Sequence, residues 1–155
     1  MDIKVEDLLA RLDELPESHR SAITLALANY NKSKKVTDAK NDFLSFVKHA
    51  WPPFIEGPHH TIMGQKFNEI ASGKLRRLII NIAPRHGKSE LTSWLLPAWL
   101  LGQDSSRKLI AATHTTEFSQ RFGRKVRNLI DSEIYREIFP DVSLRADSKA
   151  AGRWD

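Results

Sequence analysis

The segment that most constrains the fold of this chain is LIINIAPRHGKS, residues 78–89. A short apolar run leads into a tight turn that ends in Gly-Lys-Ser, and residues with helical spacing follow. The run is short and rich in β-branched residues, which is typical of a buried strand. The order of strand, turn and helix predicts a phosphate-binding loop at the start of a helix.

Each residue at the end of this turn has a distinct role in such a loop. Gly87 allows backbone N–H groups to approach phosphate oxygens, Lys88 can reach the β- and γ-phosphates, and the Ser89 hydroxyl can bind Mg²⁺. The common pattern G-x-x-x-x-G-K-[ST] also has a glycine five residues before Gly87, where this chain has Ile82. The alternative interpretation is therefore a lysine-tipped surface turn between a strand and a helix.

Periodic apolar residues before the loop predict a series of helices. The expected elements are a helical hairpin over 3–30, a polar linker over 31–35, a helix over 39–50 with Asp38 as N-cap, and a helix over 60–71 that Gly73 ends. We therefore expect a helical N-terminal extension with its linker over residues 1–37 and a second domain over residues 38–155.

Residues around and after the loop predict a βαβ unit. The expected elements are a strand over 77–83, a helix from Lys88 to about Trp94 that Pro97 kinks or ends, a strand over 108–113, a helix over 116–130 capped by Thr115 or Thr116, and a short helix over 133–138. This order favours a parallel sheet with a right-handed crossover. The predicted fold class is α/β.

Charge is distributed unevenly along the chain. The net charge is +5, but residues 1–30 carry three basic and six acidic side chains, and the remainder carries 21 basic and 13 acidic ones. The excess of basic residues after residue 30 suggests a polyanion such as nucleic acid as partner. A solvated basic face is the alternative. The chain has no cysteine, which excludes disulfides and thiolate metal sites, and no apolar run reaches membrane-spanning length.

The predicted helix over 116–130 carries basic residues away from its apolar stripe, namely Arg121, Arg124, Lys125 and Arg127. These side chains can contact DNA phosphates. They can equally line a contact between subunits, or remain solvated.

Several segments together resemble the large subunit of tailed-phage terminases, the ATP-driven DNA packaging motors. The loop itself, Pro84-Arg85-His86-Gly87-Lys88-Ser89-Glu90, resembles the deviant Walker A segment of that family, which is often Pro-Arg-x-x-Lys-Ser in form. Further similarity lies in Gly57–His60, Ser72–Asn81, Leu109–His114 and Phe118–Arg127. The resemblance covers roughly residues 40–140.

The resemblance implies an incomplete P-loop ATPase core of the RecA-like class, with ATP and Mg²⁺ bound by residues 84–90. Lys88 would stabilise the transferring γ-phosphoryl group, and Arg85 would act as an arginine finger in cis. The motor would act as a homo-oligomeric ring in the cytoplasm of an infected bacterium, at the portal of a prohead. Its partners would be double-stranded DNA, the portal protein and the small terminase subunit, with no membrane.

The upstream histidines allow two interpretations. His59 and His60 lie where the resemblance implies an adenine-binding segment. Adjacent histidines at a helix start more often have a capping or surface role, and consecutive helical residues cannot face a single metal ion. For His86 we expect a role in covering the loop.

An acidic residue at the end of a third strand, which P-loop ATPases need for Mg²⁺ and water, has no match in this sequence. The resemblance implies that this residue and a nuclease domain would follow beyond Asp155, so we expect the chain alone to bind nucleotide weakly and to hydrolyse it poorly. The alternative functions are a helicase-like P-loop ATPase and a non-enzymatic DNA-binding module.

Overall fold

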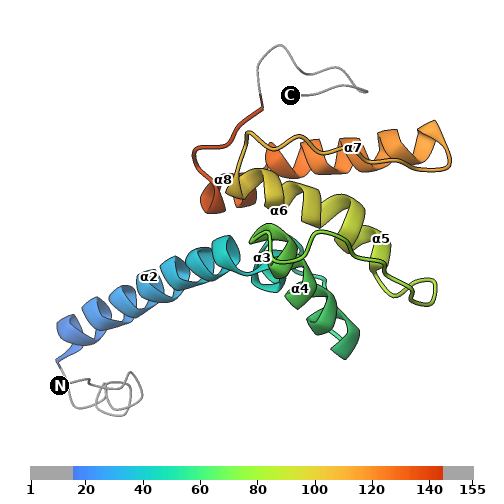
Figure 1. Ribbon diagram of the computed structural model, residues 1–155. Coiled ribbons are helices and arrows are strands. Elements are labelled where there is room, and N and C mark those ends of the chain that lie inside the picture. Colours follow the sequence, from blue (N-terminus) through green and yellow to red (C-terminus); the bar gives the residue numbers. More distant parts are fainter. Residues whose placement is uncertain (1–15, 145–155) are drawn as a thin grey trace. The chain divides into compact units, whose positions relative to one another are not determined.

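The computed structural model describes residues 16–144, and every regular element in this range is helical. Figure 1 accordingly shows coiled ribbons and connecting segments without arrows in the coloured part of the chain. The elements are α2 (Glu17–Asn41), α3 (Phe43–Ala50), α4 (Pro58–Ala71), α5 (Lys88–Glu90), η2 (Leu91–Leu95), α6 (Leu96–Gln103), α7 (Thr116–Ile130) and α8 (Glu133–Ile138). The predicted α/β fold with a parallel-sheet P-loop core is therefore wrong.

The two predicted strands are extended segments without partners. A strand requires a neighbouring extended chain for its backbone N–H and C=O groups. Within residues 16–144, neither 77–83 nor 108–113 makes such a backbone pairing. Leu78 and Ile80 pack against the helical core while Ile79 between them is 86% exposed. The first segment thus has the side-chain alternation of a strand but rests on helices rather than in a sheet.

The chain divides into two compact units, residues 1–35 and residues 36–155. Helix α2 continues without a break through residues 31–35, so the predicted linker there is wrong. The first half of the predicted hairpin lies outside the described residues, and its second half is the beginning of α2. The proposed boundary after residue 37 stays a prediction.

Asp42, not Asp38, caps the helix that follows α2. Its backbone is extended, with φ −130°, and its carboxylate accepts a hydrogen bond of 2.8 Å from the Ser45 N–H. The other carboxylate oxygen accepts one of 2.7 Å from the Asn68 amide on α4. Asn68 in turn accepts a bond from the Phe43 N–H. The cap of α3 is thereby joined to α4.

The core of the second unit lies between α3, α4, η2, α6, α7 and α8. Phe43 makes edge-to-face contacts with Phe67 at 4.9 Å and with Trp99 at 5.6 Å between ring centroids. The Trp99 Nε1 donates to the Ala39 carbonyl at 3.1 Å, and the Tyr135 hydroxyl donates to the Ala98 carbonyl at 2.8 Å. Both polar tips are satisfied, which is what burial of these side chains requires.

The helical run after the loop differs from its prediction at Pro97. The sequence predicts that Pro97 kinks or ends the run; the run does not end there but continues to Gln103, and it takes a π-helical form over Leu91–Leu95. Proline has no N–H and its ring clashes with the carbonyl four residues earlier. The Leu96 N–H accordingly bonds to the Leu91 carbonyl, five residues back. The wider turn accommodates the proline.

Other predicted helices are confirmed with small shifts. Helix α4 begins at Pro58, two residues earlier than expected, and Gly73 with φ +76° follows its end. Helix α7 has the predicted bounds, with the Thr115 hydroxyl accepting from the Phe118 N–H. Helix α8 also has the predicted bounds. Strong apolar periodicity and capping residues made these elements predictable.

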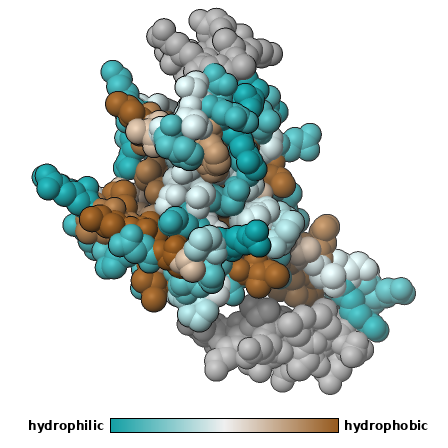
Figure 2. Space-filling model, turned by 90° about the vertical axis from the view of Figure 1, so that its right-hand side faces the viewer, coloured by the Kyte–Doolittle hydropathy of each residue, from teal (hydrophilic) through white to brown (hydrophobic). Residues whose placement is uncertain are grey.

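Apolar side chains are exposed on both extended segments. Ile79 is 86% exposed and Ile110 is 97% exposed. Figure 2 shows apolar surface, in brown, gathered beside hydrophilic surface on one face of the molecule. Among the helices of the described part, none is long and apolar enough to cross a membrane.

Candidate functional site

The predicted phosphate-binding loop is a sharply turned segment between the first extended segment and the helical run 88–103. Two of its residues have left-handed backbone conformations, Arg85 with φ +67° and Gly87 with φ +72°. Gly87 is also the N-cap of the helical run. Arginine seldom takes such a conformation, which costs about 1–2 kcal/mol for a residue with a Cβ. A strained arginine two residues before a left-handed glycine marks an unusual loop.

Most side chains of the predicted nucleotide-binding loop are accessible to solvent. Pro84, Arg85, His86 and Ser89 are exposed, and Lys88 is partly exposed. The His86 Nδ1 donates to the Pro84 carbonyl at 2.9 Å, which closes the turn internally. The predicted role of His86 in covering the loop stays a prediction.

Lys88 and Ser89 begin the helical run directly after Gly87. The Lys88 carbonyl accepts a hydrogen bond of 2.8 Å from the Thr92 hydroxyl. Within residues 16–144 no hydrogen bond or ion pair engages the Lys88 ammonium or the Ser89 hydroxyl. Both groups thus lack a side-chain partner in the described part of the chain.

His60 lies directly beneath the loop and is 7% exposed. Its Nδ1 accepts a hydrogen bond of 2.9 Å from the Gly57 N–H, at the start of α4. Because Nδ1 is the acceptor, the ring proton is on Nε2, which donates to the His86 carbonyl at 3.2 Å. A Cβ on Gly87 would lie 3.0 Å from His60 Nε2. The ring thus bridges α4 and the loop at close contact.

Burial lowers the pKa of His60, and the neighbouring His59 acts in the same direction. Two effects raise the pKa of His60: its hydrogen bond to the His86 carbonyl and the nearby charge of Glu56. Together they are weaker than the effects that lower it. The neutral ring is therefore favoured, in agreement with its accepting role at Nδ1. The capping interpretation of the histidine pair holds for His60.

Glu90, the last residue of the predicted nucleotide-binding set, contacts helix α7. Its carboxylate lies 2.6 Å from the Lys125 ammonium, which also lies 4.8 Å from the centroid of the Trp94 ring. Lys125 thus has a partner next to the loop instead of pointing freely to solvent. The structure brings one member of the predicted basic set to the predicted phosphate loop.

The remaining basic residues of α7 are distributed over its polar side. Arg121 and Arg124 are exposed, whereas Arg127 is half-buried and donates to Asn128 at 3.3 Å. The buried stripe of this helix consists of Phe122, Val126, Leu129 and Ile130. The two exposed arginines are the α7 residues best placed for an external polyanion.

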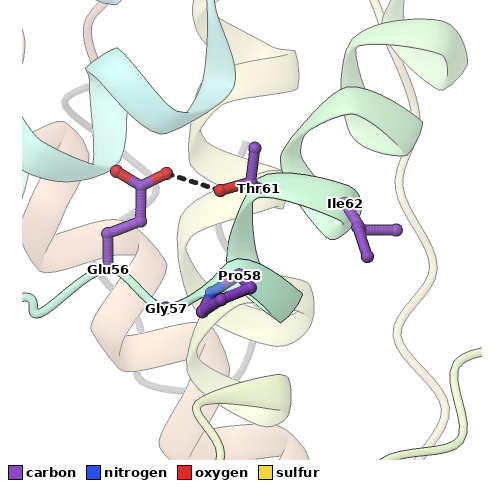
Figure 3. Close-up of a pocket in the computed structure, with 5 residues that line it drawn as sticks. All are labelled: Glu56, Gly57, Pro58, Thr61 and Ile62. Atoms are coloured by element: carbon purple, nitrogen blue, oxygen red, sulfur yellow. Dashed lines mark hydrogen bonds between the residues drawn. The ribbon is translucent and has the colours of Figure 1, made fainter.

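Two surface depressions lie on α4. Figure 3 shows the first, of about 590 Å³, where Glu56, Gly57, Pro58, Thr61 and Ile62 surround the start of the helix. The Glu56 carboxylate already binds the Thr61 hydroxyl at 2.8 Å and Lys48 at 2.6 Å. The Glu56 carboxylate is therefore satisfied without a ligand.

The second depression, of about 230 Å³, lies between α4 and the extended segment 78–82. Its wall includes His59, Ile62 and Met63. The His59 Nε2 is buried and has no hydrogen-bond partner in the described part of the chain. An adenine contact by His59, implied by the resemblance, stays a prediction.

Residues 16–144 contain no group of three His, Cys, Asp or Glu side chains able to hold a metal ion. Ser89 stays the one predicted Mg²⁺ ligand, which suits a site where phosphate oxygens and water complete the coordination.

Sequence reasoning missed two features of this site. The first is His60 as the link to the loop, although its place three residues after the N-cap Gly57 is where a side chain can reach back to the cap N–H. The second is the Glu90–Lys125 pair, which joins residues 35 positions apart. No local pattern signals a contact of that kind.

Comparison with known proteins adds no relative: a scan of family models and searches of curated proteins and of solved structures found no match to this chain.

Proposed function

We propose that residues 84–90 bind the phosphates of ATP together with Mg²⁺. One observation carries this proposal: Arg85 and Gly87, on either side of His86, are both left-handed, and Lys88-Ser89 follows Gly87 at the start of the helical run. Alternation between right- and left-handed residues turns successive backbone N–H groups toward one side, a geometry that binds anions. The N–H groups at the start of a helix add a favourable dipole.

The side chains support the same proposal. The Lys88 ammonium, unpaired in the described residues, would neutralise the β- and γ-phosphates, and the Ser89 hydroxyl would ligate Mg²⁺. Arg85 is exposed on the same loop and would fold over the γ-phosphate. Mg²⁺ supplies charge neutralisation when bound, and the chain supplies orientation through the loop amides.

The wider assignment rests on the sequence resemblance around the loop and residues 118–127. We propose a large terminase subunit that couples ATP hydrolysis to the translocation of double-stranded DNA into a prohead. Its partners would then be the portal protein, the small terminase subunit and copies of itself in a ring. Arg121 and Arg124 support DNA contact because both are exposed on α7.

Titration with a fluorescent ATP analogue and Mg²⁺ tests the loop. Lys88→Ala should weaken binding at least tenfold, since one charge-assisted contact to phosphate contributes about 1.5–3 kcal/mol. Lys74→Ala is the matched control, because Lys74 is an exposed lysine beside the turn at Gly73, and it should bind like the wild type. Equal affinity in the wild type and in Lys88→Ala contradicts the proposal.

A non-enzymatic DNA-binding module is the second candidate, and the exposed arginines of α7 favour it. It predicts DNA binding with a steep salt dependence that ATP and Mg²⁺ do not alter. Heat protection of the chain by an Mg²⁺–ATP analogue would exclude this alternative.

A further inference from the structure

His60 joins two elements that are 26 residues apart, the start of α4 and the carbonyl of His86 in the loop. It does so with both ring nitrogens, accepting at Nδ1 from the Gly57 N–H and donating at Nε2 to the loop. Only the neutral ring with its proton on Nε2 can make both bonds. A protonated ring would keep its Nε2–H toward the His86 carbonyl, but its Nδ1–H would meet the Gly57 N–H, and the two opposed donors would push the ring out of this position.

The surroundings of His60 leave little room for another arrangement. Its ring packs on Phe54 at 4.8 Å and on His59 at 3.8 Å between centroids. Gly87 approaches its Nε2 so closely that a Cβ would lie 3.0 Å away. The titratable groups that face it are His59 on α4, His86 in the loop and Glu56 in the segment before α4.

We propose that His60 is a positioning residue: in its neutral form it fastens the loop 84–90 to α4 in the shape that binds phosphate, and protonation at Nδ1, which sets two N–H groups against each other at Gly57, displaces the ring and so releases the loop. This inference rests on the proposed nucleotide binding. The link that His60 makes between Gly57 and the His86 carbonyl, called the latch below, does not itself depend on a ligand. His60 does not reach the nucleotide. It acts through the His86 carbonyl, which fixes the backbone between the left-handed residues Arg85 and Gly87.

The direction of the pH effect follows from the lowered pKa of His60. The folded state binds a proton less readily than an unfolded chain with an ordinary histidine, for which the pKa is 6.5. The latch is therefore intact at and above neutral pH, and it is lost as the pH falls below 6.5 through the pKa of the folded state. Nucleotide affinity should fall over the same range.

Two substitutions separate the two bonds of the ring. In His60→Asn the amide oxygen takes the place of Nδ1 and can accept from Gly57, but nothing reaches the loop. In His60→Gln the amide nitrogen takes the place of Nε2 and can donate to the His86 carbonyl, but the Gly57 N–H loses its partner. Neither side chain titrates in this pH range.

The experiment measures affinity for a fluorescent ATP analogue with Mg²⁺ between pH 5.5 and 8, with unfolding midpoints for each variant. We expect His60→Asn to bind about fivefold more weakly at pH 8, the effect of one lost hydrogen bond. His60→Gln should bind like the wild type at pH 8 with a lower unfolding midpoint. Below pH 6.5 the affinity of the wild type should fall further than the affinity of either variant.

His19→Gln is the matched control, because His19 is an exposed histidine on α2, and it should retain the wild-type pH profile. A pH profile in His60→Gln identical to that of the wild type overturns the latch.

NMR of the wild type without nucleotide distinguishes failure of the latch from failure of the proposed function. The His60 ring nitrogens should show an Nε2–H tautomer at pH 8, and the amide signals of Gly57 and Gly87 should shift together as His60 titrates. This result supports the latch even if the chain binds no nucleotide, an outcome that overturns the proposed function alone. Independent titration of the ring and the two amides overturns the latch.

Discussion

The Lys125 ammonium on α7 lies 2.6 Å from the Glu90 carboxylate at the end of α5. The same ammonium lies over the Trp94 ring at 4.8 Å from its centroid. The two paired side chains are about one-third exposed, so water screens the pair less than an ion pair on an open surface. This contact joins the first turn after the candidate phosphate loop to the helix that carries the exposed arginines.

A double-mutant cycle with Glu90→Gln and Lys125→Met should give a coupling energy of about 0.5–1 kcal/mol in the free energy of unfolding. The coupling should shrink at high salt because part of it is screened. The more exposed Lys66–Glu69 pair on α4 is the control, and its coupling should be smaller. A coupling of zero for Glu90 and Lys125 contradicts the contact.

The left-handed conformation of Arg85 predicts an unusual order of stability among its variants. Glycine accepts φ +67° without strain and alanine does not. Arg85→Gly should therefore be more stable than Arg85→Ala by about 1 kcal/mol, measured by urea unfolding. At Arg77, where the φ is not positive, the glycine variant should be the less stable one. The same order at both positions contradicts the loop geometry.

Gly64 allows α4 to pack closely on α3. A Cβ there would lie 2.5 Å from the Cγ of Leu44, which is 8% exposed. Gly64→Ala gains about 0.5–1 kcal/mol of helix propensity, and overpacking costs about 1–3 kcal/mol. We expect a net destabilisation of about 1 kcal/mol in thermal or urea unfolding. Gln65→Ala, at the exposed neighbouring position, should be neutral, and a stabilised Gly64→Ala would show that the helices are farther apart.

Asp42 predicts a pH dependence at the joint between α3 and α4. Burial raises the pKa of Asp42, but hydrogen bonds from Ser45 and Asn68, with Lys48 nearby, outweigh it, so the pKa lies below its usual 3.8. The ionised cap therefore contributes stability above pH 3.8, and this contribution is lost as the pH falls through the pKa of the folded state. Asp42→Asn keeps a good N-cap, and its free energy of unfolding should depend less on pH below 4. An unchanged acid slope contradicts the role of this carboxylate.

Local patterns in the sequence predicted most of the helices, because amphipathic spacing and caps act within a few residues. Thr115 before α7 and Gly73 after α4 are such signals. The prediction of a linker over 31–35 was wrong because polar residues with good helix propensity continue a helix as readily as they end one. The prediction of two strands was wrong because periodicity indicates which face of an extended segment is apolar. It does not indicate whether another strand pairs with that segment.

The sequence by itself determined which residues form the candidate loop, since Gly87, Lys88 and Ser89 follow an apolar run and begin a helical one. It also determined the buried stripe of α7, because that stripe depends only on spacing along one helix. Only the tertiary structure decided that His60 lies beneath the loop and that Glu90 pairs with Lys125. These contacts join residues 26 and 35 positions apart, and packing of whole helices, not local propensity, brings such residues together.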